Sequence, residues 1–140
     1  MGAIAGTTIV LRLEGLALAL ACLWLFALFH QSWWLFAVLI LAPDISILGY
    51  LAGPKAGAAI YNAAHSWILV VALFFLAFYP GGGDPLLLSL PFILGSHIGI
   101  DRALGFGLKH ASGFKDTHLG RLGKAAQQRS PLPPVGRGFG

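Results

Sequence analysis

Five side chains that can bind a metal or carry a proton stand within or beside apolar stretches of this 140-residue sequence. They are Glu14, Asp44, His65, His97 and Asp101. His97 and Asp101 are four residues apart and would share one face of a helix. Ionisable groups are costly in hydrocarbon, so those in membrane segments usually face the protein interior, pair with one another and mark function.

Two imidazoles and up to three carboxylates suit zinc, iron or manganese. In an open site, such a metal lowers the pKa of a bound water and makes it a nucleophile. The predicted metal ligands are Asp44, His65, His97 and Asp101, and the predicted general base is Glu14. The chemistry would be hydrolytic, on a lipid-soluble or membrane-proximal substrate.

Other interpretations of the same residues stay open. The groups can form interhelical hydrogen bonds that only stabilise a structural membrane subunit, or a His–Asp network that relays protons in a small proton- or solute-handling protein. A transporter would need polar groups in the outer leaflet, where this sequence has almost none. The sequence does not decide whether the protein is an enzyme, or which cofactor it uses.

Four apolar segments are long enough to cross a bilayer, which takes about 20 helical residues. They are residues 9–29, 33–53, 56–79 and 86–104. Backbone N–H and C=O groups in hydrocarbon must bond within the segment, which predicts helices. Because the connections are short, sequential helices should pack antiparallel. We therefore expect an all-α, integral membrane four-helix bundle with short loops.

Composition supports a membrane protein. Hydrophobic residues make up 57% of the chain and charged residues 10%, whereas soluble domains carry about 25% charged residues. The single cysteine, Cys22, excludes an internal disulfide and a cysteine-rich zinc site. The net charge is +4, but the cations gather after the last apolar segment. They indicate membrane topology rather than nucleic-acid binding.

Lys and Arg mark the cytoplasmic ends of membrane helices. In a four-pass chain the following cations share one side: Arg12, Lys55, Arg102, Lys109, Lys115, Arg121 and Lys124. The turns on the other side contain His30, Gln31, Ser32 and Asp84 instead. Both termini should therefore be cytoplasmic, with the lipid bilayer as the main partner. The five ionisable residues would lie in the cytoplasmic leaflet and form a pocket open to that side.

Neighbouring residues would support the pocket. Tyr61 and Asn62 lie four and three residues before His65, on its helix face. Pro43 lacks an N–H, so it removes the bond to the Leu39 carbonyl and should kink the helix beside Asp44.

Two further features concern helix contacts. Arg102 would either pair with Glu14 or extend to the lipid headgroups. Gly95 and Gly99 form a small-xxx-small pattern that brings a neighbouring helix, or a second copy in a homo-oligomer, into close contact.

The segment 108–126 is too polar for lipid and completes a first unit, residues 1–126. It is either a lid that adds Lys115, Asp116 or His118 to the pocket, or an interfacial segment that touches anionic headgroups. Residues 127–140, rich in Pro, Gly and Arg, should form a disordered tail.

Several separated phrases resemble a family of small bacterial membrane proteins catalogued as domain of unknown function 4260. They are residues 11–15, 42–50, 61–66, 97–102 and 113–120, and the similarity covers roughly Leu11 to Gly123. The resemblance implies a four-helix protein of the bacterial inner membrane and supplies no established activity. Its phrases contain the same Glu, Asp and His residues selected above.

Overall fold

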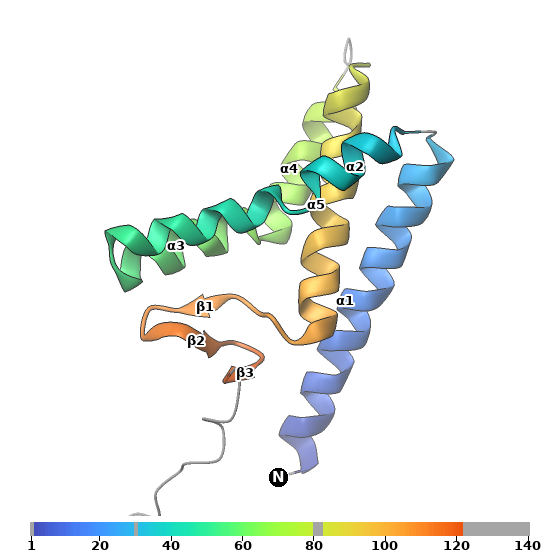
Figure 1. The fold of residues 1–140 in the computed structure, drawn as a ribbon. Coiled ribbons are helices and arrows are strands. Elements are labelled where there is room, and N and C mark those ends of the chain that lie inside the picture. The colour runs from blue at the N-terminus through green and yellow to red at the C-terminus, as the bar shows by residue number, and fades with distance from the viewer. Residues whose placement is uncertain (1, 30, 80–82, 122–140) are drawn as a thin grey trace, which may run out of the picture.

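The computed structural model describes residues 2–29, 31–79 and 83–121. In this part of the chain, five α-helices and one 3-10 helix precede three short strands (Figure 1). The helices are α1 (Gly2–Leu28), α2 (Trp33–Leu39), η1 (Ala42–Ala52, the 3-10 helix), α3 (Pro54–Ala64), α4 (Trp67–Ala77) and α5 (Pro85–Leu104). The fold is mostly helical, but the three strands depart from the predicted all-α class. The predicted tail, 127–140, lies outside the described residues.

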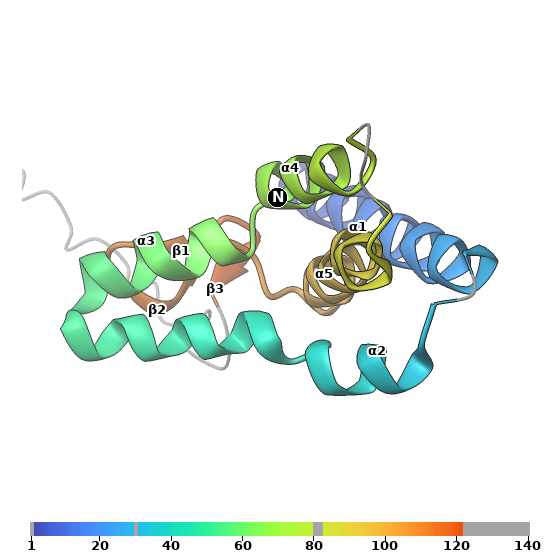
Figure 2. The same ribbon diagram turned by 90° about the horizontal axis from the view of Figure 1, so that it is seen from above.

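Small residues bring α1 and α5 close together. A Cβ on Gly99 would lie 2.6 Å from the Gly15 carbonyl oxygen, and one on Gly95 would lie 2.5 Å from the Cys22 sulfur. Glycine lets the two backbones approach. α5 is buried from residue 91 to 99 and lies between the other helices (Figure 2). Gly95 and Gly99 thus pack against the chain's own α1, so a homo-oligomer would need another surface.

Replacing Gly99 by alanine should destabilise the protein by about 1–3 kcal/mol, the usual cost of overpacking. The new Cβ would meet the α1 backbone, which cannot move aside as a flexible side chain can. Gly6→Ala is the matched control, because a Cβ there meets nothing within 4 Å. The measurement is the free energy of unfolding of both variants in the same detergent. Equal values would contradict the close contact of α1 with α5.

The second apolar segment is interrupted at its middle. α2 ends at Leu39, and the chain continues from Ala42 as η1, with Pro43 in its first turn. A proline ring clashes with the carbonyl four residues earlier, so a regular α-helix cannot continue through it. The sequence predicted a kink at this proline; the structure has a change from α-helix to 3-10 helix, which places Asp44 directly after the change.

The third apolar segment is broken as well, which the sequence analysis did not predict. α3 ends at Ala64, and Ser66 caps α4 by accepting a hydrogen bond from the Ile68 amide at 3.1 Å. The two helices are bent by 41°. His65 lies at the junction. A serine ahead of an apolar run is a common helix start and was the available signal.

The predicted helix count of four is wrong, because the described residues contain five α-helices. α1 and α4 flank α5, α2 crosses it, and η1 and α3 form a hairpin that extends to one side (Figures 1 and 2). The physical reason is the break at Ser66, where α3 is bent by 41° from α4 and so extends away beside η1.

Within the described residues, three helical stretches are long and apolar enough to cross a membrane: Gly6–Leu28, Trp33–Ala52 and Pro85–Leu104. α3 and α4 together make a fourth if the bent pair counts as one span. Large apolar side chains cover the outside; Trp34, for example, is 79% exposed and Ile68 81%. An apolar surface of this extent marks contact with a membrane or a partner.

A three-stranded antiparallel sheet follows α5, with β2 (Gly113–Thr117) between β1 (Lys109–His110) and β3 (Gly120–Arg121). Asn62 attaches it to α3. Its Nδ2 donates to the Lys109 carbonyl at 2.8 Å, and its Oδ1 accepts from the Lys109 amide at 2.7 Å. These bonds satisfy both backbone groups of Lys109, as a neighbouring strand would. The polar segment after α5 is thus a folded sheet as far as residue 121.

Candidate metal centre

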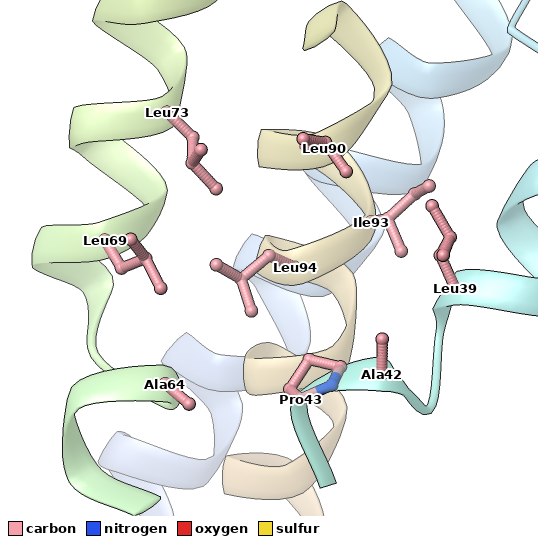
Figure 3. Close-up of a pocket in the computed structure, with 9 residues that line it drawn as sticks. All are labelled: Leu39, Ala42, Pro43, Ala64, Leu69, Leu73, Leu90, Ile93 and Leu94. Carbon is pink, nitrogen blue, oxygen red and sulfur yellow. The ribbon is translucent and has the colours of Figure 1, made fainter. Parts of the chain in front are cut away.

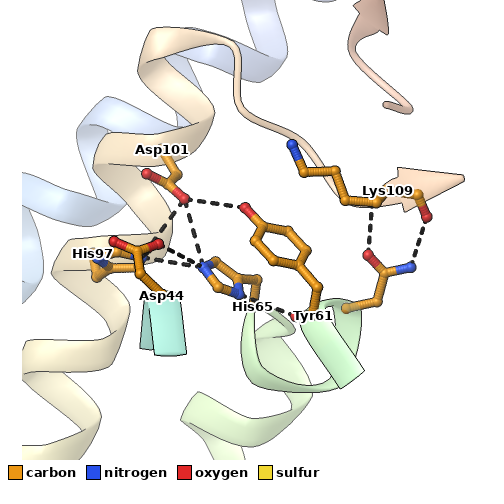
Figure 4. A network of polar contacts seen from close by, with 7 residues as sticks. Asp44, Tyr61, His65, His97, Asp101 and Lys109 are labelled. Atoms are coloured by element: carbon orange, nitrogen blue, oxygen red, sulfur yellow. Dashed lines mark hydrogen bonds and ion pairs between the residues drawn. The ribbon is translucent and has the colours of Figure 1, made fainter. Parts of the chain in front are cut away.

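The four predicted metal ligands meet at one point (Figure 4). Asp44 comes from the start of η1, and His65 from the junction of α3 and α4. His97 and Asp101 come from one face of α5. One ligand atom from each lies within 4.8 Å of the other three. Each of the two helix breaks therefore places one ligand at the same point beside α5.

The distances fit a tetrahedral metal. The two His Nε2 atoms are 3.1 Å apart. His65 Nε2 lies 3.6 Å from Asp44 Oδ1 and 3.7 Å from Asp101 Oδ2, and the same distances from His97 Nε2 are 3.5 and 3.6 Å. Tetrahedral ligands at about 2.0–2.2 Å from zinc are separated by roughly 3.3–3.6 Å. Small side-chain movements would thus accommodate an ion of this size.

Tyr61 orients the His65 ring. Its carbonyl oxygen lies 3.0 Å from His65 Nδ1, and because a carbonyl only accepts, Nδ1 must carry the hydrogen. In the neutral ring, Nε2 then presents its lone pair to the cluster, as a metal ligand does. The two rings stack with centroids 3.8 Å apart. The Tyr61 hydroxyl also donates to Asp101 Oδ2 at 3.4 Å.

The charge of the cluster also favours a cation. His65 and His97 are buried, whereas the Asp44 and Asp101 side chains are 40% and 20% exposed. Within the described part of the chain, no Lys or Arg nitrogen lies within 4.0 Å of either carboxylate. Two partly buried carboxylates side by side are unfavourable without a compensating charge. A divalent cation would neutralise both.

The carboxylates face a polar pocket of about 310 Å³. Asp44 and Asp101 share its lining with Lys109 and with aromatic and aliphatic side chains. Lys109 is only 4% exposed, and its Nζ lies 4.1 Å from the centre of the Phe114 ring and 5.1 Å from that of Tyr61. Burial lowers the pKa of Lys109, and the Asp101 carboxylate opposes this shift. Aromatic faces stabilise an ammonium group in such a position.

The sequence analysis missed Lys109 as a pocket residue and treated it only as a marker of topology. Phe114, from the same polar segment, also lines the pocket. A strand of two residues, Lys109–His110, has no periodicity that a sequence pattern can reveal. Asn62, in contrast, was predicted as a supporting residue, and the structure places it behind Lys109.

Glu14 does not join the four ligands. It precedes Gly15, which packs against α5, so the Glu14 side chain turns away and is exposed. Its predicted role as general base stays a prediction. Among the ion pairs of the described residues, none joins Glu14 to Arg102. Arg102 instead lies 5.6 Å from the centre of the Trp67 ring.

The three predicted lid residues, Lys115, Asp116 and His118, lie on or beside β2. Lys115 is exposed, and the Asp116 backbone pairs with that of Arg121, while the Asp116 side chain is outside the described part of the structure. His118 Nδ1 accepts a hydrogen bond from the Leu108 amide at 2.8 Å. Burial and the nearby Arg102 lower the pKa of His118. The segment therefore reaches the pocket through Lys109 and Phe114 instead.

No curated protein and no solved structure matches the chain. The family described as a domain of unknown function (DUF4260) matches residues 8–122. This range contains all four clustered ligands, the two helix breaks and the sheet, and it confirms the resemblance seen in the sequence. The chain therefore belongs to the DUF4260 family.

Proposed function

We propose that the protein is an integral membrane metalloprotein that holds one divalent cation, zinc or else iron or manganese, and uses it for hydrolysis. The ligands are Asp44, His65, His97 and Asp101. The observation that carries the proposal is the near-tetrahedral set of two imidazole nitrogens and two carboxylate oxygens, five of whose separations lie between 3.1 and 3.7 Å.

The pocket beside the carboxylates supports catalysis over a purely structural metal. Four protein ligands complete a tetrahedral zinc site, so a water or substrate would have to bind as a fifth ligand, an expansion that catalytic zinc can make. The partly exposed Asp44 and Asp101 lie on the pocket side of the cluster. A divalent metal held there would lower the pKa of a water and polarise a carbonyl or phosphoryl oxygen. Tyr61 orients Asp101 and His65, and the Lys109 ammonium faces the space where negative charge would develop.

The membrane orientation we propose places both ends of the fold in the cytoplasm of a bacterial cell. The beginning of α1 and the sheet lie at the same end of the α1–α5 pair (Figure 1). That end carries Arg12, Arg102 and Lys109, whereas the opposite turns carry Gln31 and Asp84. Cytoplasmic ends are enriched in Lys and Arg. The polar pocket, between the sheet and the end of α5, would then open toward the cytoplasm.

A second candidate is a metal-free hydrogen-bond network that stabilises the fold or relays protons. The observation that favours it is the 3.1 Å distance between the two Nε2 atoms, because a hydrogen on His97 Nε2 would be donated to His65 Nε2. Such interhelical bonds are worth about 0.6–2 kcal/mol in membrane proteins. This candidate leaves the two unneutralised carboxylates without a role.

Metal titration of the purified protein in nanodiscs tests the proposal. After chelator treatment, we expect it to bind one equivalent of Co²⁺ with the visible spectrum of tetrahedral coordination. Zn²⁺ at 100 times its Kd should stabilise the fold by about 2.7 kcal/mol. Hydrolysis of nitrophenyl ester or phosphate probes should return with the metal. Failure to bind a stoichiometric metal would exclude the metal site, and binding without hydrolysis of any probe would contradict the catalytic part.

A further inference from the structure

A second pocket, of about 190 Å³, lies between α2, η1, α4 and α5 (Figure 3). All nine residues that line it are Ala, Leu, Ile or Pro. Leu69 and Leu73 of α4 face Leu90 and Leu94 of α5 across it. A lining without polar groups can hold an alkyl chain and offers nothing to a polar ligand.

This apolar pocket adjoins the metal centre. Pro43 and Ala64 line it, and each directly precedes a ligand, Asp44 or His65. Leu94 lies about one helical turn before His97. The polar pocket has an entirely different lining, which includes Asp44 and Asp101. Pro43 lines the apolar pocket and the next residue, the partly exposed Asp44, lines the polar one, so the two pockets are neighbours at the start of η1.

The polar pocket contains a buried cation, Lys109, that makes no close ion pair with a described carboxylate. Among the described side chains, no carboxylate oxygen lies within 4.0 Å of Lys109 Nζ. The position of the residue is nevertheless well determined, because Asn62 binds both of its backbone groups. In Figure 4 the Lys109 side chain extends toward the edge of the cluster where Asp101 and the Tyr61 hydroxyl lie. A buried ammonium beside a metal centre is suited to an anionic group that contacts both.

We propose that the substrate is a phosphate monoester of a long-chain alcohol, with its phosphate between the metal and Lys109 and its chain in the apolar pocket. This inference rests on the proposed metal-dependent hydrolysis. The oxygen of a water would bond to phosphorus, and the bond from phosphorus to the alkyl oxygen would break. A proton passes to the leaving oxygen, so that the products are the free alcohol and inorganic phosphate.

Binding of three probes to the zinc-loaded protein in nanodiscs tests the substrate class: inorganic phosphate, butyl phosphate and octyl phosphate. Empty nanodiscs correct for partition into lipid. Each buried methylene tightens binding about fourfold, so we expect octyl phosphate to bind at least tenfold more tightly than butyl phosphate. Equal affinity for inorganic and octyl phosphate would overturn the lipid assignment and indicate a soluble phosphate compound.

Substitutions in the two pockets show where each part of the probe binds. Leu73→Trp fills the apolar pocket, so the preference for octyl over butyl phosphate should disappear while inorganic phosphate binds as before; Leu90→Trp repeats this from α5. The control is Leu76→Trp, which is exposed and outside the pocket. Lys109→Met should weaken all three probes at least tenfold, and Lys115→Met, exposed on β2, should not.

Metal content, measured on the same samples, distinguishes failure of the proposed function from failure of the substrate assignment. A wild-type protein that takes up no zinc would contradict the proposed function itself. The protein could bind zinc while its affinity for the phosphate probes changes neither with Lys109→Met nor with the length of the alkyl chain. That result would overturn only the substrate assignment.

Discussion

Replacing both His65 and His97 by alanine should reduce bound metal from one ion per chain to almost none. The two Nε2 atoms are half of the ligand set, and Asp44 and Asp101 would remain as two carboxylates alone. Four-ligand zinc sites bind with roughly 10–16 kcal/mol of apparent free energy. If two ligands contribute about half of this, the affinity falls by more than a thousandfold.

The measurement is metal per chain by mass spectrometry after equilibration with buffered zinc. His110→Ala is the matched control, because His110 is exposed on β1 and outside the cluster. Equal metal content in the wild type and the double variant would remove the metal site. The metal-free network predicts a different pattern: neither protein binds metal, and the double variant loses only stability.

Asn62→Leu should release the sheet from α3 while leaving the metal centre in place. The leucine has the right volume but cannot bond either backbone group of Lys109. A polar group left buried and unsatisfied costs about 1–3 kcal/mol, so loss of both bonds should weaken docking by about 2–6 kcal/mol. Because Lys109 would then lose its position, phosphate binding should weaken about as much as in Lys109→Met.

Hydrogen exchange followed by mass spectrometry measures this release. Peptides from 108–121 should exchange faster, whereas peptides of α1 and α5 should be unchanged. Asn62→Asp provides a graded comparison, since it keeps an acceptor for the Lys109 amide and loses the donor to its carbonyl. Unchanged exchange in the sheet of Asn62→Leu would show that other contacts hold it.

The two helix breaks explain why a site forms here. At the end of α3, the chain stops making regular helical bonds, and His65 takes a non-helical backbone conformation. Asp44 follows Pro43, where η1 begins. Irregular backbone is tolerated in a membrane protein where it is packed in protein or lines a cavity. A break therefore places a ligand beside α5 from a direction that a straight, parallel helix would not provide.

Residue types and their positions in the apolar segments were enough to predict the four clustered ligands. Because acids and imidazoles are costly in hydrocarbon, the side chains of Asp44, His65, His97 and Asp101 were expected to contact one another. The same physical rule identified the apolar segments, and the spacing of Gly95 and Gly99 predicted a close helix contact. These are properties of residue type and distance along the chain, which need no coordinates.

The directions of the side chains and of the helices follow from the packing of the whole chain. Hydropathy measures how much a residue gains from burial but not where its side chain points, so it selected Glu14, which faces away from the cluster. It also treated residues 56–79 as one helix, because a single serine scarcely alters mean hydropathy. Lys109 became part of the site through hydrogen bonds to Asn62, 47 residues away. Such long-range contacts depend on the packing of the whole chain, so no local pattern contains them.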